Sequence, residues 1–329
     1  MENLEIFNEE TKKYCETVLK ETDKKREESI EWVRNWLDNN KEYNARRDAY
    51  SLIRYMRACK YNHERAIKKL ECMHKLRTSA PEWYENRDPL LPEIQELMKL
   101  GVFLPLLQRD PEGRAVILIR ATAHDPRKHL QNNVFKTGLM ILDLFLNRFQ
   151  DTSVYGVVAI LDLKDVTLGH ARQMTIPIIR KCVHSWQDCY PVRMRSINFT
   201  NSPSAINVVL NVIKGFMNKK IKERACYPVR IRSINFINSP SYVNVVLNIF
   251  RRFMNPKLRM RVHVHGYDIN SLEQQVPLNL LPPEYGGSGD SLDFLIDYWT
   301  TQVTEAIDWY KEDEVYRYTE TAQTSQPEN

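Results

Sequence analysis

The sequence predicts an α/β protein: a mixed, largely parallel sheet flanked by helices, preceded by an all-α N-terminal helical module. Three observations indicate this fold class. Residues 1–95 show helical periodicity, residues 96–287 alternate strand and helix patterns, and one strand–helix unit of 37 residues occurs twice in succession. At 329 residues the chain is long enough to bury a substantial core.

The N-terminal module is expected to occupy residues 1–95. Residues 9–39 predict one charged helix, residues 49–60 predict a second helix with an apolar face, and Asn62 is a suitable N-cap for a third. A proline-containing loop, which includes Pro81, is expected to separate this module from the rest of the chain.

A sheet domain is expected over residues 96–287. The turn residues at 109–114 include proline and glycine where a hairpin needs them. The nearly continuous apolar run at 157–163 is typical of a strand buried on both faces. The expected elements, in order, are strands at 103–108 and 115–120, a helix at 131–149, a strand at 157–163 and a helix at 172–187.

The repeated unit occupies residues 189–225 and again 226–262, with 24 of its 37 positions identical. In the second copy, residues 229–237 are rich in β-branched and aromatic side chains and predict a strand. Ser239 then offers an N-cap, followed by proline and an apolar stripe at helical spacing. Each copy is therefore expected to form a strand, an amphipathic helix and a basic tail.

The two copies concentrate positive charge. They carry net charges of +6 and +7, whereas the whole chain is only +5, so everything outside them sums to −8. The sequence leaves open which copy enters the sheet. Because the second copy continues directly into residues 262–266, we expect it to hold the normal position. The surplus unit is then extruded or adds a strand, unless two alternative exons have been joined in a gene model.

Other features limit the class of protein. The N-terminus is polar and acidic, no apolar run approaches a membrane span, and the six cysteines have no framework spacing. We therefore expect a reduced, cytoplasmic protein. Residues 288–329 are acidic, and we expect their first part to pack on the body as an amphipathic helix and their end to be disordered.

Several sequence motifs resemble one known family. LIRYMRACKYNHERAIKKL followed by PEWYENRDP is similar to the N-terminal helical module of CRAL-TRIO proteins. RDPEGRAVILIR, VVAILDLKD, CYPVRIRSINFINSP, KLRMRVHVHG and LPPEYGG resemble successive landmarks of the CRAL-TRIO lipid-binding domain, in the same order. The resemblance extends from about Asn44 to Tyr298 and is nearest to the alpha-tocopherol transfer protein-like members. It implies the CRAL-TRIO fold.

The resemblance also implies a function. It indicates a non-enzymatic intracellular carrier that binds a small hydrophobic lipid, tocopherol- or retinoid-like, in an apolar pocket under an amphipathic lid. The carrier would exchange this lipid at phosphoinositide-containing membranes. The local pattern agrees, because a lipid carrier needs an apolar cavity, a movable apolar cover and a cationic surface. We expect a monomer with no cofactor.

Residue-by-residue matching places the functional groups of the family on this sequence. The pocket wall falls on Phe135, Leu139, Leu142, Val157, Leu168, Met174, Ile178, Cys182, Trp186, Tyr190 and Ile197. The lid falls on Val243, Val246, Leu247, Phe250 and Phe253, or on their counterparts in the first copy. The phosphoinositide-contacting residues fall on Arg57, Arg193, Arg195, Arg230, Arg232, Lys257 and Arg261.

The sequence departs from the family pattern in two ways. Relatives have a basic residue where this chain has Cys59, although Lys60 follows directly. This departure leaves one headgroup contact without its usual side chain. The second departure is the duplication itself.

The sequence has few features of an enzyme, a metalloprotein or a nucleic-acid binder. The sequence has no GxGxxG, GxxxxGK[ST] or HExxH motif, and Asp162 at a strand end has no partner base or nucleophile. His263 and His265 have no further ligands spaced to complete a metal site. A nucleic-acid binder is disfavoured because the excess charge is confined to one segment. The main alternative is a phosphoinositide-binding adaptor in membrane traffic that does not transfer lipid in bulk.

Overall fold

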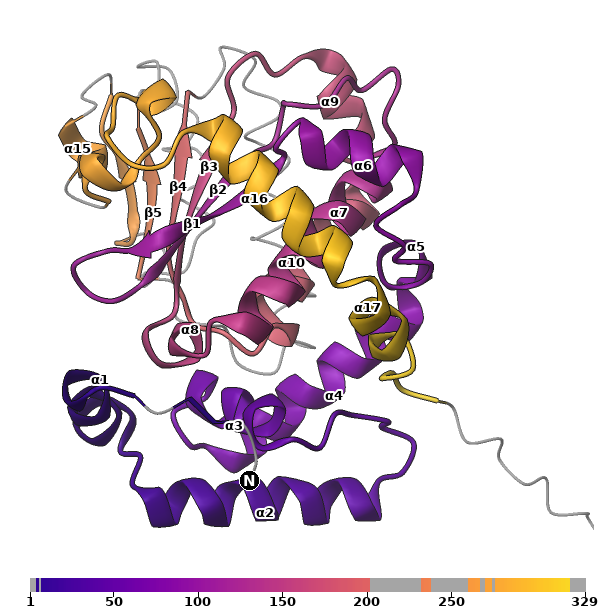
Figure 1. Cartoon of the computed structure of the whole chain (residues 1–329), viewed down its shortest axis with the longest axis vertical. Helices are drawn as coiled ribbons and strands as arrows, with labels where there is room; N and C mark the ends of the chain where they lie inside the picture. Colours follow the sequence, from indigo (N-terminus) through magenta and orange to yellow (C-terminus); the bar gives the residue numbers. More distant parts are fainter. Residues whose placement is uncertain are drawn as a thin grey trace, which may run out of the picture.

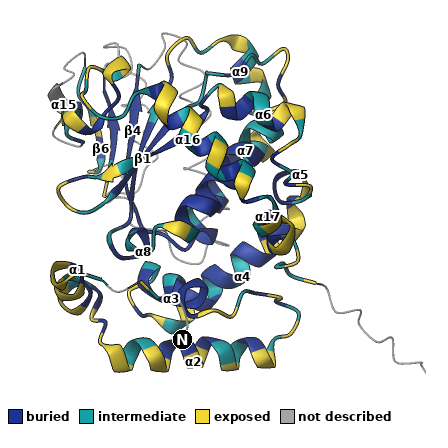
Figure 2. Cartoon of the chain, viewed as in Figure 1, coloured by how far each residue is buried: buried dark blue, intermediate teal, exposed yellow. Residues whose placement is uncertain are grey.

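A computed structural model of the chain describes residues 4–5, 7–201, 232–237, 260–266, 270–273 and 276–319. A sheet with helices packed beside it forms the upper part of the view in Figure 1, and the helices of residues 9–79 lie beneath it. The sheet strands and helix α7 (Gln131–Arg148), which packs on them, are the most deeply buried elements, whereas α2 (Asp23–Asn39) is exposed along its outer side (Figure 2).

The N-terminal module contains more helices than the sequence predicts. Its helices are α1 (Glu9–Tyr14), the π-helical turn η1 (Cys15–Leu19), α2 (Asp23–Asn39), α3 (Ala49–Ala58), α4 (His63–Ser79), α5 (Pro81–Tyr84) and α6 (Pro92–Lys99).

The single helix expected at 9–39 is wrong. The chain turns at Lys20, whose φ is 59°, and restarts at Thr22, whose side chain accepts a hydrogen bond from the Lys25 amide. Asn62 caps α4 as expected, since its side chain accepts from the Arg65 amide. Pro81 begins a short helix and does not lie in a loop.

Within the described ranges, the sheet has six strands in the order β1-β2-β3-β4-β5-β6. They are β1 (Phe103–Arg109), β2 (Ala115–Arg120), β3 (Val157–Asp162), β4 (Met194–Thr200), β5 (Ser233–Phe236) and β6 (Val262–Val264). The first pair is antiparallel and all others are parallel. The prediction of a mixed, largely parallel sheet is thus confirmed.

Both copies of the repeated strand enter the sheet, which answers the question that the sequence left open. β4 comes from the first copy and β5 from the second, and they pair in parallel with a constant offset of 37 residues. Identical side chains therefore lie side by side. The Asn235 side-chain amide donates to Asn198 Oδ1 at 2.8 Å, and the rings of Phe199 and Phe236 stack 5.0 Å apart. The surplus unit adds a strand.

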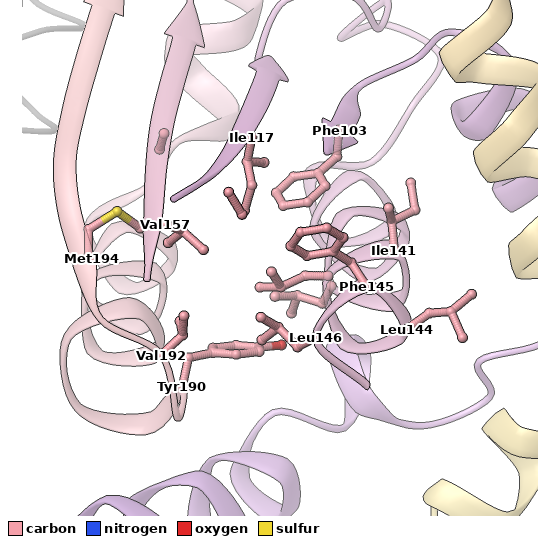
Figure 3. Packing of buried hydrophobic residues seen from close by; sticks show 14 of the residues in the cluster. Phe103, Ile117, Ile141, Leu144, Phe145, Leu146, Val157, Tyr190, Val192 and Met194 are labelled. Carbon is pink, nitrogen blue, oxygen red and sulfur yellow. The ribbon is translucent and has the colours of Figure 1, made fainter. Parts of the chain in front are cut away.

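The helices between the strands cover the sheet. They are α7 (Gln131–Arg148), α8 (Asp151–Tyr155), α9 (Leu168–Gln173), α10 (Ile176–His184) and the π-helical turn η2 (Ser185–Cys189). The helix predicted at 172–187 is divided, because α9 ends and α10 restarts at Thr175 with a proline in its first turn. Phe103, Phe145 and Val157 point toward one another between the sheet and α7 (Figure 3).

The chain returns to the body after the sheet. The elements there are α15 (Asn270–Glu273), η3 (Leu278–Leu280), η4 (Pro283–Tyr285), α16 (Leu292–Glu305) and α17 (Ile307–Asp313). α16 is the amphipathic helix expected in this segment, and its Trp299 donates to the Pro105 carbonyl at 2.8 Å. Asp313 is buried, but the charges of Arg77 and Arg87 outweigh burial and lower its pKa. Helix α17, which ends at Asp313, is therefore joined to the N-terminal module by ion pairs.

Candidate functional site

A cavity of about 210 Å³ lies between strands β1–β4 and helices α7, α9 and α10. Among the described residues that line it, none carries a carboxylate, ammonium or guanidinium group. The volume is below the roughly 300–1,000 Å³ of typical ligand sites. Because its described lining has no charged group, the cavity suits an uncharged, mostly hydrocarbon ligand.

Four polar side chains reach this wall: Thr122, Gln131, His170 and Gln187. Two of them are already engaged, because the Thr122 hydroxyl bonds to the Lys164 carbonyl and His170 bonds to Thr167 and to the His124 carbonyl. The side-chain amides of Gln131 and Gln187 have no hydrogen-bond partner recorded within the described ranges. Like the indole N–H of Trp186, these amides can meet a hydroxyl or carbonyl of a ligand.

The structure places six of the eleven matched pocket residues on the cavity wall. They are Phe135, Leu139, Met174, Cys182, Trp186 and Ile197. Burial raises the pKa of the Cys182 thiol to about 12, so this side chain stays neutral and acts as a small apolar group.

The other five do not line the cavity. Leu142 and Val157 continue the helix stripe and the strand face of the wall, but at their level the sheet and α7 are packed in contact. Tyr190 is buried and donates to Asp143 Oδ1 at 2.9 Å, away from the cavity. On α10 the neighbour of Ile178, Ile179, faces inward. Leu168 begins α9 and is 65% exposed.

Several wall residues were missed by family matching. Six of them lie on strands: Phe103, Ile119, Ala159, Leu161, Met194 and Phe199. A period-two pattern was available as a signal, because Phe199 lies two residues after Ile197 and therefore on the same sheet face. The lid residues Val243, Val246, Leu247, Phe250 and Phe253 lie outside the described residues, as do Arg230 and Lys257.

Arg57 was matched to the phosphoinositide site, and the structure contradicts this placement. Its side chain is 2% exposed and makes a two-point ion pair with Glu21, at 2.7 and 2.9 Å. It also bonds to the Ser153 hydroxyl. A guanidinium that is buried and already neutralised cannot contact a membrane headgroup without breaking this pair.

Arg193 and Arg195 lie at the beginning of β4, and both are 7% exposed. Arg195 donates from Nε to the Tyr155 carbonyl at 2.7 Å and from Nη2 to the Tyr14 hydroxyl at 2.8 Å. All three guanidinium nitrogens of Arg193 are buried without a hydrogen-bond partner among the described residues. Burial and the neighbouring Arg195 lower the Arg193 pKa to about 10. Two buried cations thus lie together without a carboxylate partner among the described residues.

Two further cations border this pair. Arg232 is the copy-two equivalent of Arg195; its side chain is 60% exposed and lies 3.8 Å from Glu112. Lys60 is exposed in the turn between α3 and α4, and burial and the charges of Arg193 and Arg195 lower its pKa. Arg261 lies directly before β6, half-buried, and its carbonyl accepts from the Ile234 amide. Of the matched basic residues, Arg232 therefore lies beside Arg193 and Arg195.

Within the described ranges, no helix is long and apolar enough to cross a membrane. No cluster of three or more histidine, cysteine or acidic side chains suited to a metal ion occurs in those ranges. His265 bonds to Asn235 Oδ1 at 3.2 Å, next to the asparagine pair of the sheet.

Several curated proteins are similar in sequence to this chain. The alpha-tocopherol transfer protein-like proteins of Mus musculus and Homo sapiens are 27% and 26% identical over 246 residues, which is 75% of this chain and 60% of each relative. Clavesin-2 of Rattus norvegicus is 24% identical over 242 residues, 74% of this chain and 62% of that protein. The match thus spans less than two thirds of these relatives.

The crystal structure of Sfh5 is 14% identical and superposes with a TM-score of 0.41, covering 95% of this chain and 99% of that chain. This likeness is too weak to support an argument.

Family models give the broader assignment. The Pinta-like UBA domain model matches residues 22–94. The CRAL/TRIO domain model matches residues 100–225 and 224–287, and these two matches meet at the boundary between the repeated copies. Together they cover more than half of the chain. The protein therefore belongs to the CRAL/TRIO domain family.

Proposed function

We propose that this protein is a non-enzymatic carrier that binds a small neutral lipid, tocopherol- or retinoid-like, and exchanges it at phosphoinositide-containing membranes. The observation that carries the proposal is the cavity, whose described wall is apolar and without charge. An ionised fatty acid or a phosphate headgroup placed there would have no counter-charge, and burying such a group costs several kcal/mol. A neutral lipid with one hydroxyl or carbonyl group fits this wall.

The molecular surface also favours membrane exchange. Leu130, Leu168 and Ile176 are exposed and belong to the segments that frame the cavity around α9. Apolar side chains presented to solvent beside a lipid cavity can enter the interfacial region of a bilayer. The arginine cluster at the start of β4 supplies the charge that attracts anionic headgroups. The proposed location is the cytoplasm, with transient association at membranes.

The test is native purification followed by mass spectrometry of the intact protein and of its extracted small molecules. One hydrophobic passenger per chain supports the carrier and identifies its lipid class. Leu139→Trp puts an indole into the cavity and should remove the passenger. Leu168→Trp makes the same change on an exposed residue and should leave the passenger bound.

The second candidate is a phosphoinositide-binding adaptor, which the uncompensated arginines favour. An empty protein that still binds phosphoinositide vesicles would support the adaptor and contradict the carrier. Loss of the passenger in both tryptophan variants would also contradict the assignment to this cavity.

A further inference from the structure

The strongest unexplained feature of the structure is the environment of Arg193. A buried guanidinium normally has a carboxylate or several carbonyl partners, because its desolvation is otherwise not offset. Arg193 has neither among the described residues, and its three nitrogens are buried. The nearby acids are engaged elsewhere: Glu21 pairs with Arg57, and Asp110 pairs with Arg114. The charge of Arg193 therefore has no anionic partner among the described residues.

The charges that act on Arg193 are those of the cations Arg195 and Arg232, and the hydroxyl of Tyr14 lies beside it. Tyr14, the last residue of α1, accepts from Arg195 through its hydroxyl oxygen, and its own hydrogen has no acceptor recorded in the described part of the chain. Burial opposes ionisation of Tyr14, but the charges of Arg195 and Arg193 outweigh it and lower the pKa. The phenol is thus polarised toward donating its proton to an anion.

The backbone allows these groups to come close. Gly156 follows α8 with φ of +90°, and a Cβ there would lie 2.3 Å from the Arg193 carbonyl oxygen. The ring of Tyr14 lies against that of Tyr155 at 4.6 Å, so α1 covers the arginine pair. The site thus has a floor formed by the start of β4, a wall formed by α1 and an outer rim formed by Lys60 and Arg232.

We propose that Tyr14 and the N-terminal helix complete an enclosed phosphomonoester site with Arg193 and Arg195, in which the Tyr14 hydroxyl donates to a phosphate oxygen. This inference rests on the proposed membrane exchange and names the group that is recognised. A terminal phosphate offers three oxygens and a charge near −2, which matches donors arriving from separate directions. A phosphodiester has fewer free oxygens and less charge.

The new element is the participation of the N-terminal helix. Tyr14 lies outside residues 22–94 and 100–287, which the family models match. Because Tyr14 belongs to the helical module and the arginines belong to the sheet, a phosphate bound between them joins the two parts. Binding should therefore slow backbone amide exchange in residues 9–19.

The experiment compares three variants of the full chain. Tyr14→Phe removes one hydroxyl and should weaken binding of inositol 1,4,5-trisphosphate by roughly tenfold or more, the usual effect of losing a hydrogen bond to a charged group. Arg193→Gln should abolish binding. Tyr155→Phe is the matched control, since its hydroxyl donates to Thr11 and not to the arginines, and it should bind like the wild type.

Vesicles distinguish a lipid headgroup from a free phosphate. The same order of variants on vesicles with phosphatidylinositol 4,5-bisphosphate, and no Tyr14→Phe effect on phosphatidylserine vesicles of equal charge, supports a headgroup. Binding of the soluble phosphate alone supports the same chemistry with a soluble ligand.

Wild-type affinity in Tyr14→Phe together with lost binding in Arg193→Gln would overturn the role of Tyr14 while leaving membrane exchange intact. Absence of any phosphate binding in the wild type would overturn the site and the membrane part of the proposed function. The passenger measurement still decides the carrier function independently. Thermal unfolding of each variant excludes a loss of fold as the cause.

Discussion

The two strands from the repeated unit, β4 and β5, differ less in sequence than in environment. Arg195 on β4 is 7% exposed and bonds to Tyr14 and Tyr155, whereas the side chain of its equivalent, Arg232 directly before β5, is 60% exposed and lies near Glu112. Phe199 lines the cavity, and Phe236, stacked on it, does not. The same residue type at the same position of a copied unit thus has two roles.

The reason for this difference is geometric. Neighbouring strands are about 4.8 Å apart, so the second copy repeats the strand one position further along the sheet. At the position of β4, α1 and α8 cover the arginines and the helices enclose the cavity. One strand further, Arg232 reaches solvent. The second copy therefore provides a strand with nearly the same residues as β4, but α1, α8 and the cavity helices lie against the first.

The largest expected effect comes from the stacked rings. Phe199→Ala and Phe236→Ala should each lower the free energy of unfolding by about 3–5 kcal/mol, because both side chains are buried. Only Phe199→Ala should also change the amount or identity of the bound passenger. Urea unfolding and mass spectrometry measure the two quantities. Equal passenger loss in both variants would show that the copies share the cavity.

The arginines give the next effect. Arg195→Ala removes a buried, hydrogen-bonded charge and should weaken binding to phosphoinositide vesicles by about 1.5–3 kcal/mol. Arg232→Ala removes a surface charge, for which about 1 kcal/mol is expected, with strong dependence on salt. Vesicle sedimentation at two salt concentrations provides the measurement. A larger loss in Arg232→Ala would place the headgroup on the second copy.

The asparagine pair tests how the two copies are joined. Asn235→Ala leaves the buried Asn198 Oδ1 without this donor and should cost about 1–3 kcal/mol of stability. Asn198→Ala should cost a similar amount. It removes the same bond between the asparagines, together with the bond that the Asn198 side-chain amide donates to the Ala159 carbonyl. The double variant should cost less than the sum of the two, because each single change leaves a partner unpaired. Additive losses in urea unfolding would argue against this coupling.

The smallest effect is a spectroscopic shift. The pKa of Tyr14 lies below its ordinary value, because Arg195 and Arg193 favour the phenolate more than burial opposes it. Arg195→Ala removes one cation and should raise this pKa, whereas Arg232→Ala should change it less. The ultraviolet titration of each protein, minus that of its Tyr14→Phe counterpart, isolates this phenol. An equal shift in both variants would mean that Arg232 also approaches Tyr14.

The sign of this shift also sets its effect on stability. A phenol with a lowered pKa stabilises the fold above the pKa of the unfolded chain, near 10, and that contribution disappears as the pH falls through the folded value. This contribution to stability therefore appears only on the alkaline side of the folded pKa. Phosphate binding at pH 7 is therefore the more sensitive measure of this site.

Local sequence patterns predicted the elements of the fold well. The cap at Asn62, the hairpin strands, the helix at 131–149 and the apolar strand at 157–163 depend on periodicity and on turn residues close in sequence. The predicted helix at 9–39 was wrong, because the break at Lys20 restarts through a single threonine cap within a continuous charged pattern. A helical pattern does not reveal a one-residue turn.

The candidate site was less predictable. Arg57 lies two residues before the position where the family has its basic contact, but its partner Glu21 lies 36 residues earlier in the chain, and this ion pair removes Arg57 from the surface. Leu168 has the side chain of a wall residue, yet α9 turns it toward solvent. Tyr14 was not singled out at all, since no motif links a tyrosine on the first helix to arginines 180 residues later.

The sequence by itself determined that a strand–helix unit is present twice, that the sheet is mixed and that basic charge gathers on the copies. These features depend on spacing and composition, which the chain carries locally. The tertiary structure decided that both strands pair in register, which arginine is buried and which phenylalanine faces the cavity. Burial depends on the segments that pack around a residue, and here those segments come from distant parts of the chain.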